Sequence, residues 1–157
     1  MKQKIILLIS LFIVFVSCDK DDASKELDKE QLLALVNESR ASGCDCGSTF
    51  YPAVGKLVWN EQLEQAAKTH SQDMNNKDKL THTGSNGSSP GDRITDTGYV
   101  WTTYGENIAW NYSSEAQVIQ GWLDSEGHCQ NIMNANVTEM GVALEGKYWT
   151  QVFANAQ

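Results

Sequence analysis

The chain has 157 residues, of which 41% are apolar and 20% charged, and its formal net charge is −8. This length and apolar fraction are typical of one folded domain with a buried core and exclude a disordered polypeptide. With 20 Asp and Glu against 12 Lys and Arg, the composition argues against nucleic acid as a partner, because phosphate binding needs clustered Lys and Arg.

The chain begins with the pattern of an export signal. Lys2 and Lys4 precede an apolar run over residues 5–16. This run is too short for the roughly 20 residues of a membrane-spanning helix but has the length of a signal-peptide core. It ends at Ser17 and Cys18, and a small residue followed directly by Cys resembles the lipobox of bacterial lipoproteins. We therefore expect residues 1–17 to be removed and Cys18 to carry the lipid; the alternative is an ordinary secretory signal.

Residues 18–28 are predicted to form a lipidated acidic tether. Removal of the leader with its two lysines would leave 140 residues and change the net charge from −8 to −10. The sequence DKDD at 19–22 is solvated charge with nothing to pack, which favours a simple spacer. A second interpretation is an address, since KDD after a lipidated Cys resembles the signal that sends some lipoproteins to the outer face of a Gram-negative outer membrane. The expected location is the outer membrane, and the cell surface under this second interpretation.

The next 50 residues predict two helices. Asp28 is a good N-cap, an apolar face follows at helical spacing, and Gly43 is a plausible end. A second helix begins after Asn60 and places an apolar stripe at residues 63, 67 and 74. His70 lies on that stripe, so we expect it to be a core or cleft-edge residue that makes a hydrogen bond.

The second half mixes loop, helix and strand signals. Residues 78–104 are expected to form a long polar loop with one short helix between Ser89 and Gly98. Residues 106–110 predict a strand, and a helix follows an N-cap at Ser113 or Ser114. Residues 140–144 and 148–153 predict an antiparallel hairpin that turns at 145–146. Helices combined with a sheet built partly of hairpins indicate an α+β layered domain.

Seven short motifs follow one another in a specific order. They are LVWN at 57–60, HSQDM at 70–74, THTG at 81–84, GENIA at 105–109, SEGHCQNIM at 125–133, MGVA at 140–143 and YWTQVF at 148–153. Together they resemble the CAP superfamily, also called the SCP or cysteine-rich secretory, antigen 5 and pathogenesis-related-1 domain, in its bacterial branch. The resemblance covers residues 29–157 and implies a three-layer α-β-α sandwich with a mainly antiparallel sheet.

Three residues within these motifs point to a common site. His82 lies in the long loop beside small residues, Glu106 lies on a strand next to a glycine, and His128 follows a glycine at a helix end. Two imidazoles and one carboxylate can bind a divalent metal such as zinc and leave one coordination position open. The same side chains can instead act without metal as acid, base and hydrogen-bond donor. A third interpretation is structural, with His82 and Glu106 bracing the loop.

The resemblance also indicates where the site is altered. CAP clefts carry two His and two acidic residues, and His82 and Glu106 match the first of each. The second acidic position falls on Ser125, and the acidic residues on either side of it are further candidates. The second His of eukaryotic members has no counterpart at its position, and the bacterial pattern supplies His128 instead.

After cleavage three cysteines remain besides Cys18, and an exported protein with this number favours one disulfide with one thiol left over. The resemblance to bacterial members implies a Cys46–Cys129 pair. Cys44 is then free, or it replaces Cys46 in the pair. A Cys44–Cys46 bridge is disfavoured, because so short a loop strains the geometry.

Two functions remain open at this stage. The first, which we favour, is a monomeric, lipid-anchored binding module that presents its His and Glu cleft to a lipid, peptide or protein ligand, as the resemblance implies. The second is a peptidase-like or esterase-like hydrolase in which His82, Glu106 and His128 activate water directly or through a metal. No nucleophile elbow, His-Glu-x-x-His pair or phosphate loop occurs to favour the second.

Overall fold

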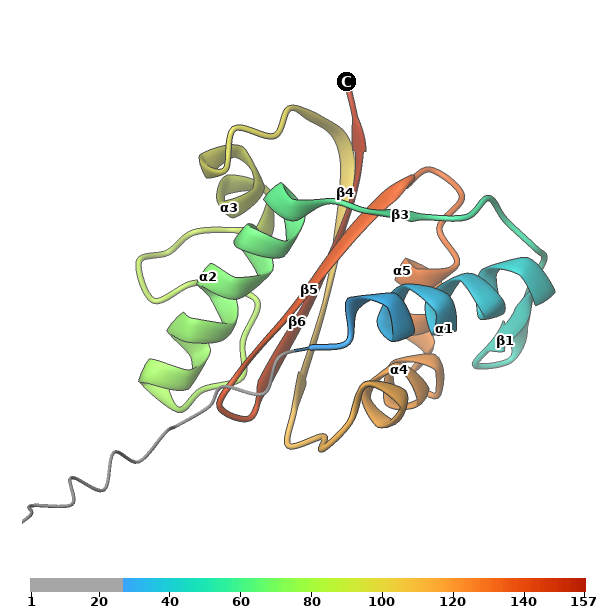
Figure 1. The fold of residues 1–157 in the computed structure, drawn as a ribbon, viewed down its shortest axis with the longest axis horizontal. Coiled ribbons are helices and arrows are strands. Elements are labelled where there is room, and N and C mark those ends of the chain that lie inside the picture. Colours follow the sequence, from blue (N-terminus) through green and yellow to red (C-terminus); the bar gives the residue numbers. More distant parts are fainter. Residues whose placement is uncertain (1–26) are drawn as a thin grey trace, which may run out of the picture.

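The computed structural model describes residues 27–157 (Figure 1). The expected signal peptide, the lipid-bearing Cys18 and nearly all of the tether lie outside the described residues. The elements in chain order are α1 (Lys29–Ser42), β1 (Cys44–Cys46), β2 (Thr49–Tyr51), β3 (Val58–Trp59), α2 (Glu61–Lys77), α3 (Pro90–Asp96), β4 (Trp101–Trp110), α4 (Glu115–Leu123), α5 (Glu126–Ile132), β5 (Glu139–Glu145) and β6 (Tyr148–Ala156). In this part of the chain, no helix has the length and apolarity to cross a bilayer.

The central sheet has four strands in the order β3-β5-β6-β4. The β5–β6 and β6–β4 pairs are antiparallel, and the short β3 strand pairs in parallel with β5. The expected hairpin joins β5 to β6, and Gly146 supplies its positive φ of 58°. A separate two-stranded hairpin is formed by β1 and β2. The sheet is therefore mainly antiparallel, with β4 at one edge.

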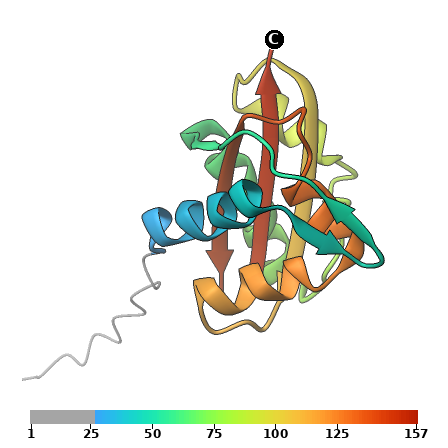
Figure 2. The same cartoon turned by 90° about the vertical axis from the view of Figure 1, so that its right-hand side faces the viewer.

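Helices cover both faces of this sheet (Figures 1 and 2). One face carries α2 and α3, and Leu63 and Ile94 from these helices are buried against Val152 of β6. The other face carries α1, α4 and α5, and it holds the larger core cluster, which includes Trp122 and Trp149. The α+β fold with its α-β-α layers is thus confirmed.

Local capping chemistry explains where the helices begin. The Asp28 side chain accepts a hydrogen bond from the Gln31 backbone, and the Asn60 side chain caps the first turn of α2. Ser89 forms a capping box at α3, and Ser114 caps α4. These caps satisfy backbone N–H groups that have no partner inside the helix, so the sequence signals and the observed boundaries agree.

Close approach of α2 to the sheet depends on Gly141 of β5. A Cβ atom there would lie 2.1 Å from the backbone nitrogen of Glu64. The missing side chain therefore lets the backbone of α2 rest directly on the strand. This contact fixes the height of α2 above the sheet, and α2 carries His70.

Three features differ from the sequence-based expectations. The long loop after α2 ends earlier than residue 104, because β4 begins at Trp101. The strands β1, β2 and β3 were not expected, since each has only two or three residues and lacks an alternating pattern. The separate seven-residue α5 was not expected either; His128 lies in its first turn, at a helix end as predicted.

Candidate functional site

The candidate site lies at the edge of the sheet formed by β4. Successive residues of a strand point to opposite faces, and Glu106 and Asn107 follow this rule. Glu106 contacts side chains on the α2 and α3 side, whereas Asn107 donates a hydrogen bond to the His128 carbonyl oxygen of α5 at 3.2 Å. The edge strand thus connects the two helical layers.

The Glu106 carboxylate is buried and doubly bound. Its side chain is 2% exposed; Oε2 accepts from the Arg93 guanidinium at 2.6 Å, and Oε1 lies 2.7 Å from Nδ1 of His82. Arg93 is 5% exposed and also donates to the His82 carbonyl oxygen at 3.1 Å. Arg93 therefore neutralises the carboxylate and holds the loop that carries His82.

His82 presents one ring edge to solvent. Its side chain is 53% exposed although Nδ1 is engaged by Glu106. An ionised carboxylate can only accept, so Nδ1 carries a proton, and in the neutral form of the ring Nε2 is left as an acceptor. This arrangement resembles the orienting carboxylate–imidazole pairs of hydrolytic enzymes, where the carboxylate fixes the tautomer.

His70 of α2 also holds the loop that carries His82. It is fully buried on α2, as expected, and its Nε2 lies 2.7 Å from the Thr81 carbonyl oxygen. A carbonyl only accepts, so Nε2 is the protonated nitrogen and Nδ1 is an acceptor, which has no hydrogen-bond partner among the described residues. Burial lowers the pKa of His70, opposed in part by nearby Glu106. His70 is therefore neutral near pH 7.

On the opposite layer, α5 brings His128 toward His82. Burial lowers the pKa of His128, and the neighbouring His82 lowers it further. Asn131 of the same helix donates to the Glu106 carbonyl oxygen at 3.1 Å and to the Asn107 side-chain oxygen at 2.9 Å. These hydrogen bonds hold α5 against the edge of β4 and place His128 close enough to His82 for the two imidazoles to interact electrostatically.

The other acidic and hydroxyl candidates make no side-chain hydrogen bond or ion pair with His82, Glu106 or His128. Ser125 is the N-cap residue of α5, but its hydroxyl makes no capping hydrogen bond. Asp124 accepts from Gln120, and Glu126 accepts from Gln130 at the solvent-exposed surface. No contact of these residues brings a second carboxylate to His82.

Arg93 and the asparagines at 107 and 131 were missed by sequence reasoning. Arg93 follows a Ser-Pro-Gly-Asp start in a polar segment, and nothing in its spacing links it to Glu106. Only the packing of α3 against β4 makes that link. The signal that pointed to Asn107 and Asn131 was their presence in the GENIA and SEGHCQNIM motifs, without a role for either.

The three expected metal ligands do not form a ready-made site. Within residues 27–157, the only group of three or more His, Cys, Asp or Glu whose ligand atoms all lie within 4.8 Å of one another is Cys44, Cys46 and Cys129. Glu106 is also committed to Arg93, whose positive charge would oppose a cation. Binding of zinc by His82, Glu106 and His128 thus requires rearrangement and stays a prediction.

Two of the cavities in the described part of the chain border this cluster. One of about 350 Å³ is bordered by Lys77, Thr81 and Ser85, and a second of about 160 Å³ is bordered by His70 and Arg93. A third, of about 290 Å³, lies along residues 98–101. Thr81 and Thr83 of the first cavity flank His82 in its loop, and Arg93 of the second cavity contacts Glu106.

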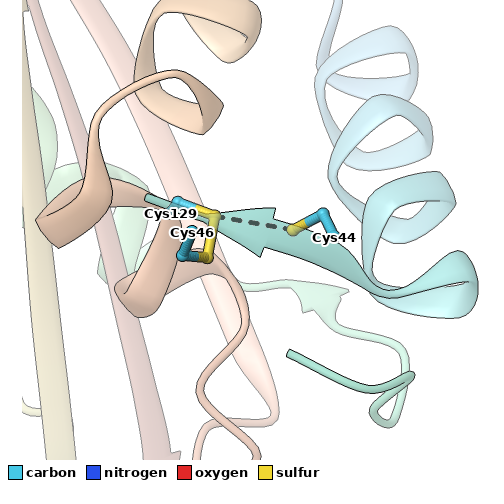
Figure 3. Close-up of side chains that lie close together, drawn as sticks. All are labelled: Cys44, Cys46 and Cys129. Atoms are coloured by element: carbon cyan, nitrogen blue, oxygen red, sulfur yellow. Dashed lines mark hydrogen bonds between the residues drawn. A yellow bond between two sulfur atoms is a disulfide. The ribbon is translucent and has the colours of Figure 1, made fainter. Parts of the chain in front are cut away.

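The disulfide joins Cys46 to Cys129, which is the pairing that the bacterial pattern implied. It ties the β1–β2 hairpin to α5, one residue from His128. Cys44 is a free thiol, and its sulfur lies 3.5 Å from that of Cys129 (Figure 3).

Comparisons with known proteins agree with this architecture. The model of the cysteine-rich secretory protein family, CAP, matches residues 33–153. The membrane protein YlbC of Bacillus subtilis is 31% identical over 138 residues, which are 88% of this chain and 37% of that protein. YkwD of the same organism is 38% identical over 99 residues, which are 62% of this chain and 38% of that protein. The chain therefore spans less than two fifths of these curated relatives.

Solved structures give the same result. An extracellular SCP-domain protein from Bacillus anthracis has a TM-score of 0.69 and 31% identity, over 80% of this chain and 39% of that one. An outer surface protein from Borrelia burgdorferi has a TM-score of 0.68 over 82% of this chain and 95% of that one; at 20% identity it supports the fold alone.

Proposed function

Because this chain belongs to the CAP family of cysteine-rich secretory proteins, we propose that it is an exported, lipid-anchored binding module whose contact surface is the edge of β4. The observation that carries the proposal is His82, a half-exposed imidazole held by the buried pair of Glu106 and Arg93. A polar group that is fixed before binding loses little conformational freedom when it meets a ligand, which favours affinity.

Two properties of this surface define what it would recognise. In its neutral form His82 offers Nε2 as an acceptor. Burial and the neighbouring His82 lower the pKa of His128, so His128 is neutral at pH 7. Among the described residues, Glu106 is the only carboxylate that contacts His82. A half-exposed imidazole suits a donor group on a lipid, peptide or protein ligand that lies across the surface.

The proposed location is the outer membrane, with the lipid on Cys18, and under the address interpretation the cell surface. Relatives described as a membrane protein and as an extracellular protein support export in general terms. Mass spectrometry of the N-terminal peptide tests whether Cys18 carries the lipid, and Cys18→Ser is the control. Protease shaving of intact cells tests the outer face, and full protection of the protein would remove that part of the proposal.

A second candidate is a hydrolase, and the specific observation that favours it is the contact between Glu106 and His82. A carboxylate that orients an imidazole makes it a better general base, and His82 could activate a water molecule through Nε2. Among the described residues, no Ser or Cys nucleophile contacts His82. The binding function is therefore preferred, and catalysis remains the alternative.

One set of variants separates the two functions. His82→Ala removes the exposed imidazole, and Thr83→Ala changes an exposed neighbour in the same loop without touching Glu106. We would measure turnover of peptide and ester substrates and the binding of zinc. Ligand binding would be followed by shifts of the histidine ring signals in NMR spectra on addition of lipid, peptide and protein fractions of the cell envelope. The binding proposal expects ring shifts in the wild type and Thr83→Ala but no binding in His82→Ala. Turnover lost only in His82→Ala would favour the hydrolase, and binding unchanged in His82→Ala would overturn the proposal.

A further inference from the structure

Three sulfur atoms lie together where the β1–β2 hairpin meets α5 (Figure 3). Cys44 and Cys46 are two residues apart on β1, and a strand directs such residues to the same face. Asp45 lies between them and is exposed. Both thiol positions of β1 therefore face Cys129, although only Cys46 is bonded to it.

Accessibility differs sharply within this group. Cys46 and Cys129 are fully buried, whereas Cys44 is partly exposed. An external thiol must reach a sulfur atom to reduce a disulfide, so the burial of both bonded cysteines excludes direct attack on the folded protein. Cys44 combines access to solvent with a sulfur only 3.5 Å from Cys129.

We propose that Cys44, Cys46 and Cys129 form a thiol–disulfide exchange site, through which small external thiols reach the otherwise buried disulfide by way of Cys44. The site takes thiols and disulfides of low molecular weight as its reactants. It is independent of the ligand that the β4 edge binds.

The first step is internal and needs no external oxidant or reductant. The Cys44 thiolate attacks the Cys129 sulfur, a Cys44–Cys129 bond forms and the Cys46–Cys129 bond breaks. The electron pair of the broken bond stays on the Cys46 sulfur, which takes up the proton that Cys44 gave up. One disulfide and one thiol are present before and after this step, so its redox balance is zero.

The second step connects the site to its surroundings. An external thiolate attacks the partly exposed Cys44 sulfur, forms a mixed disulfide with Cys44 and releases Cys129 as a thiolate. A second external thiolate attacks the external sulfur of the mixed disulfide and releases Cys44. Two external thiols are oxidised to one disulfide, and the protein disulfide is reduced to two thiols.

The surroundings of Cys44 restrain this reaction at neutral pH. Burial raises the pKa of the Cys44 thiol, and the neighbouring Asp45 carboxylate raises it further. The nucleophilic thiolate is therefore scarce at pH 7 and increases as the pH rises.

The internal step also changes the residue of β1 to which α5 is bonded, from Cys46 to Cys44. These two positions are about 7 Å apart along the backbone at the usual rise of a strand. His128 is adjacent to Cys129, the residue of α5 that carries this bond.

Reduction kinetics of the native protein test the proposal. The full lipoprotein in detergent is treated with dithiothreitol without denaturant, samples are alkylated at intervals, and the remaining Cys46–Cys129 disulfide is measured by mass spectrometry. Cys44→Ser is expected to slow reduction at least tenfold relative to the wild type, and the two proteins should react at equal rates in urea. Asp45→Asn is expected to accelerate reduction at pH 7, because it removes a charge that disfavours the thiolate.

Peptide mapping provides an independent measurement. Cleavage on the N-terminal side of Asp45 separates Cys44 from Cys46, so the two disulfide isomers give different linked peptides. Wild-type protein held without reductant at pH 8.5 and quenched in acid should contain a Cys44–Cys129 peptide, and Cys46→Ser should form that bond as its only disulfide. Equal native reduction rates in wild type and Cys44→Ser, or the absence of the Cys44–Cys129 peptide from both samples, would overturn the proposal.

Discussion

Replacement of Glu106 by Gln is expected to destabilise the fold by about 3 kcal/mol, because it leaves the buried Arg93 charge without a counter-charge. Loss of one partner of a buried ion pair costs about 3–5 kcal/mol. The lower end applies here, since Arg93 keeps the carbonyl oxygens of Ser88 and His82 as acceptors. The contact with His82 adds little to this figure, because that side chain is 53% exposed and screened by water.

Urea unfolding at pH 7 with the disulfide intact measures this loss. The chain supplies a matched control in the ion pair between Lys29 and Glu64, which has the same 2.6 Å separation but side chains that are 48% and 25% exposed. Lys29→Gln is expected to cost at most about 1 kcal/mol. A double variant that also carries Arg93→Gln should lose less than the sum of its two single changes. If Glu106→Gln cost no more than Lys29→Gln, burial would not set the strength of the pair and the reasoning would be wrong.

Three further predictions concern pH, packing and the disulfide. The fold lowers the pKa of His70. As the pH falls below about 6.5, the ordinary pKa of histidine, the unfolded chain therefore takes up a proton that the folded chain does not, and stability declines. His70→Gln should flatten the dependence of the unfolding free energy on pH between 7.5 and 5, and an unchanged slope would contradict this. Gly141→Ala should lower the free energy of unfolding by about 3 kcal/mol or more, because its Cβ would lie 2.1 Å from the backbone of α2. Gly55→Ala is the control: its Cβ would meet no atom within 4 Å, and it should change the free energy of unfolding by less than about 0.5 kcal/mol. Under non-reducing conditions Cys129→Ser should lower the free energy of unfolding by about 4 kcal/mol. Cys46→Ser should lower it clearly less, because Cys44 can bond to Cys129 in place of Cys46. Equal losses in the two variants would contradict this replacement.

Much of the fold was predictable because its signals are local. A capping residue at the start of each longer helix and apolar residues at helical spacing located α1, α2 and α4. Alternating residues around Gly146 located the β5–β6 hairpin. The strands of two or three residues were not predictable, since β3 exists only because β5 offers it a partner at Val58 and Trp59.

The candidate site was predictable only in part. The motifs led to His82, Glu106 and His128, and the structure brings the first two into contact and places His128 close enough to lower its pKa through His82. They did not reveal Arg93, because its pairing with Glu106 joins residues on α3 and β4 that share no periodic pattern.

The order of residues along the chain determined the helix starts and the β5–β6 hairpin, because each is encoded by neighbours a few positions apart. The same local patterns predict export and the histidines of the candidate site. The tertiary structure alone decided that Glu106 is neutralised by Arg93, that His70 holds the loop through Thr81, and that Cys44 lies against the buried disulfide. The physical reason is that charge neutralisation, burial and sulfur contacts depend on distances between segments far apart in sequence, which are set only when both helical layers pack on the sheet.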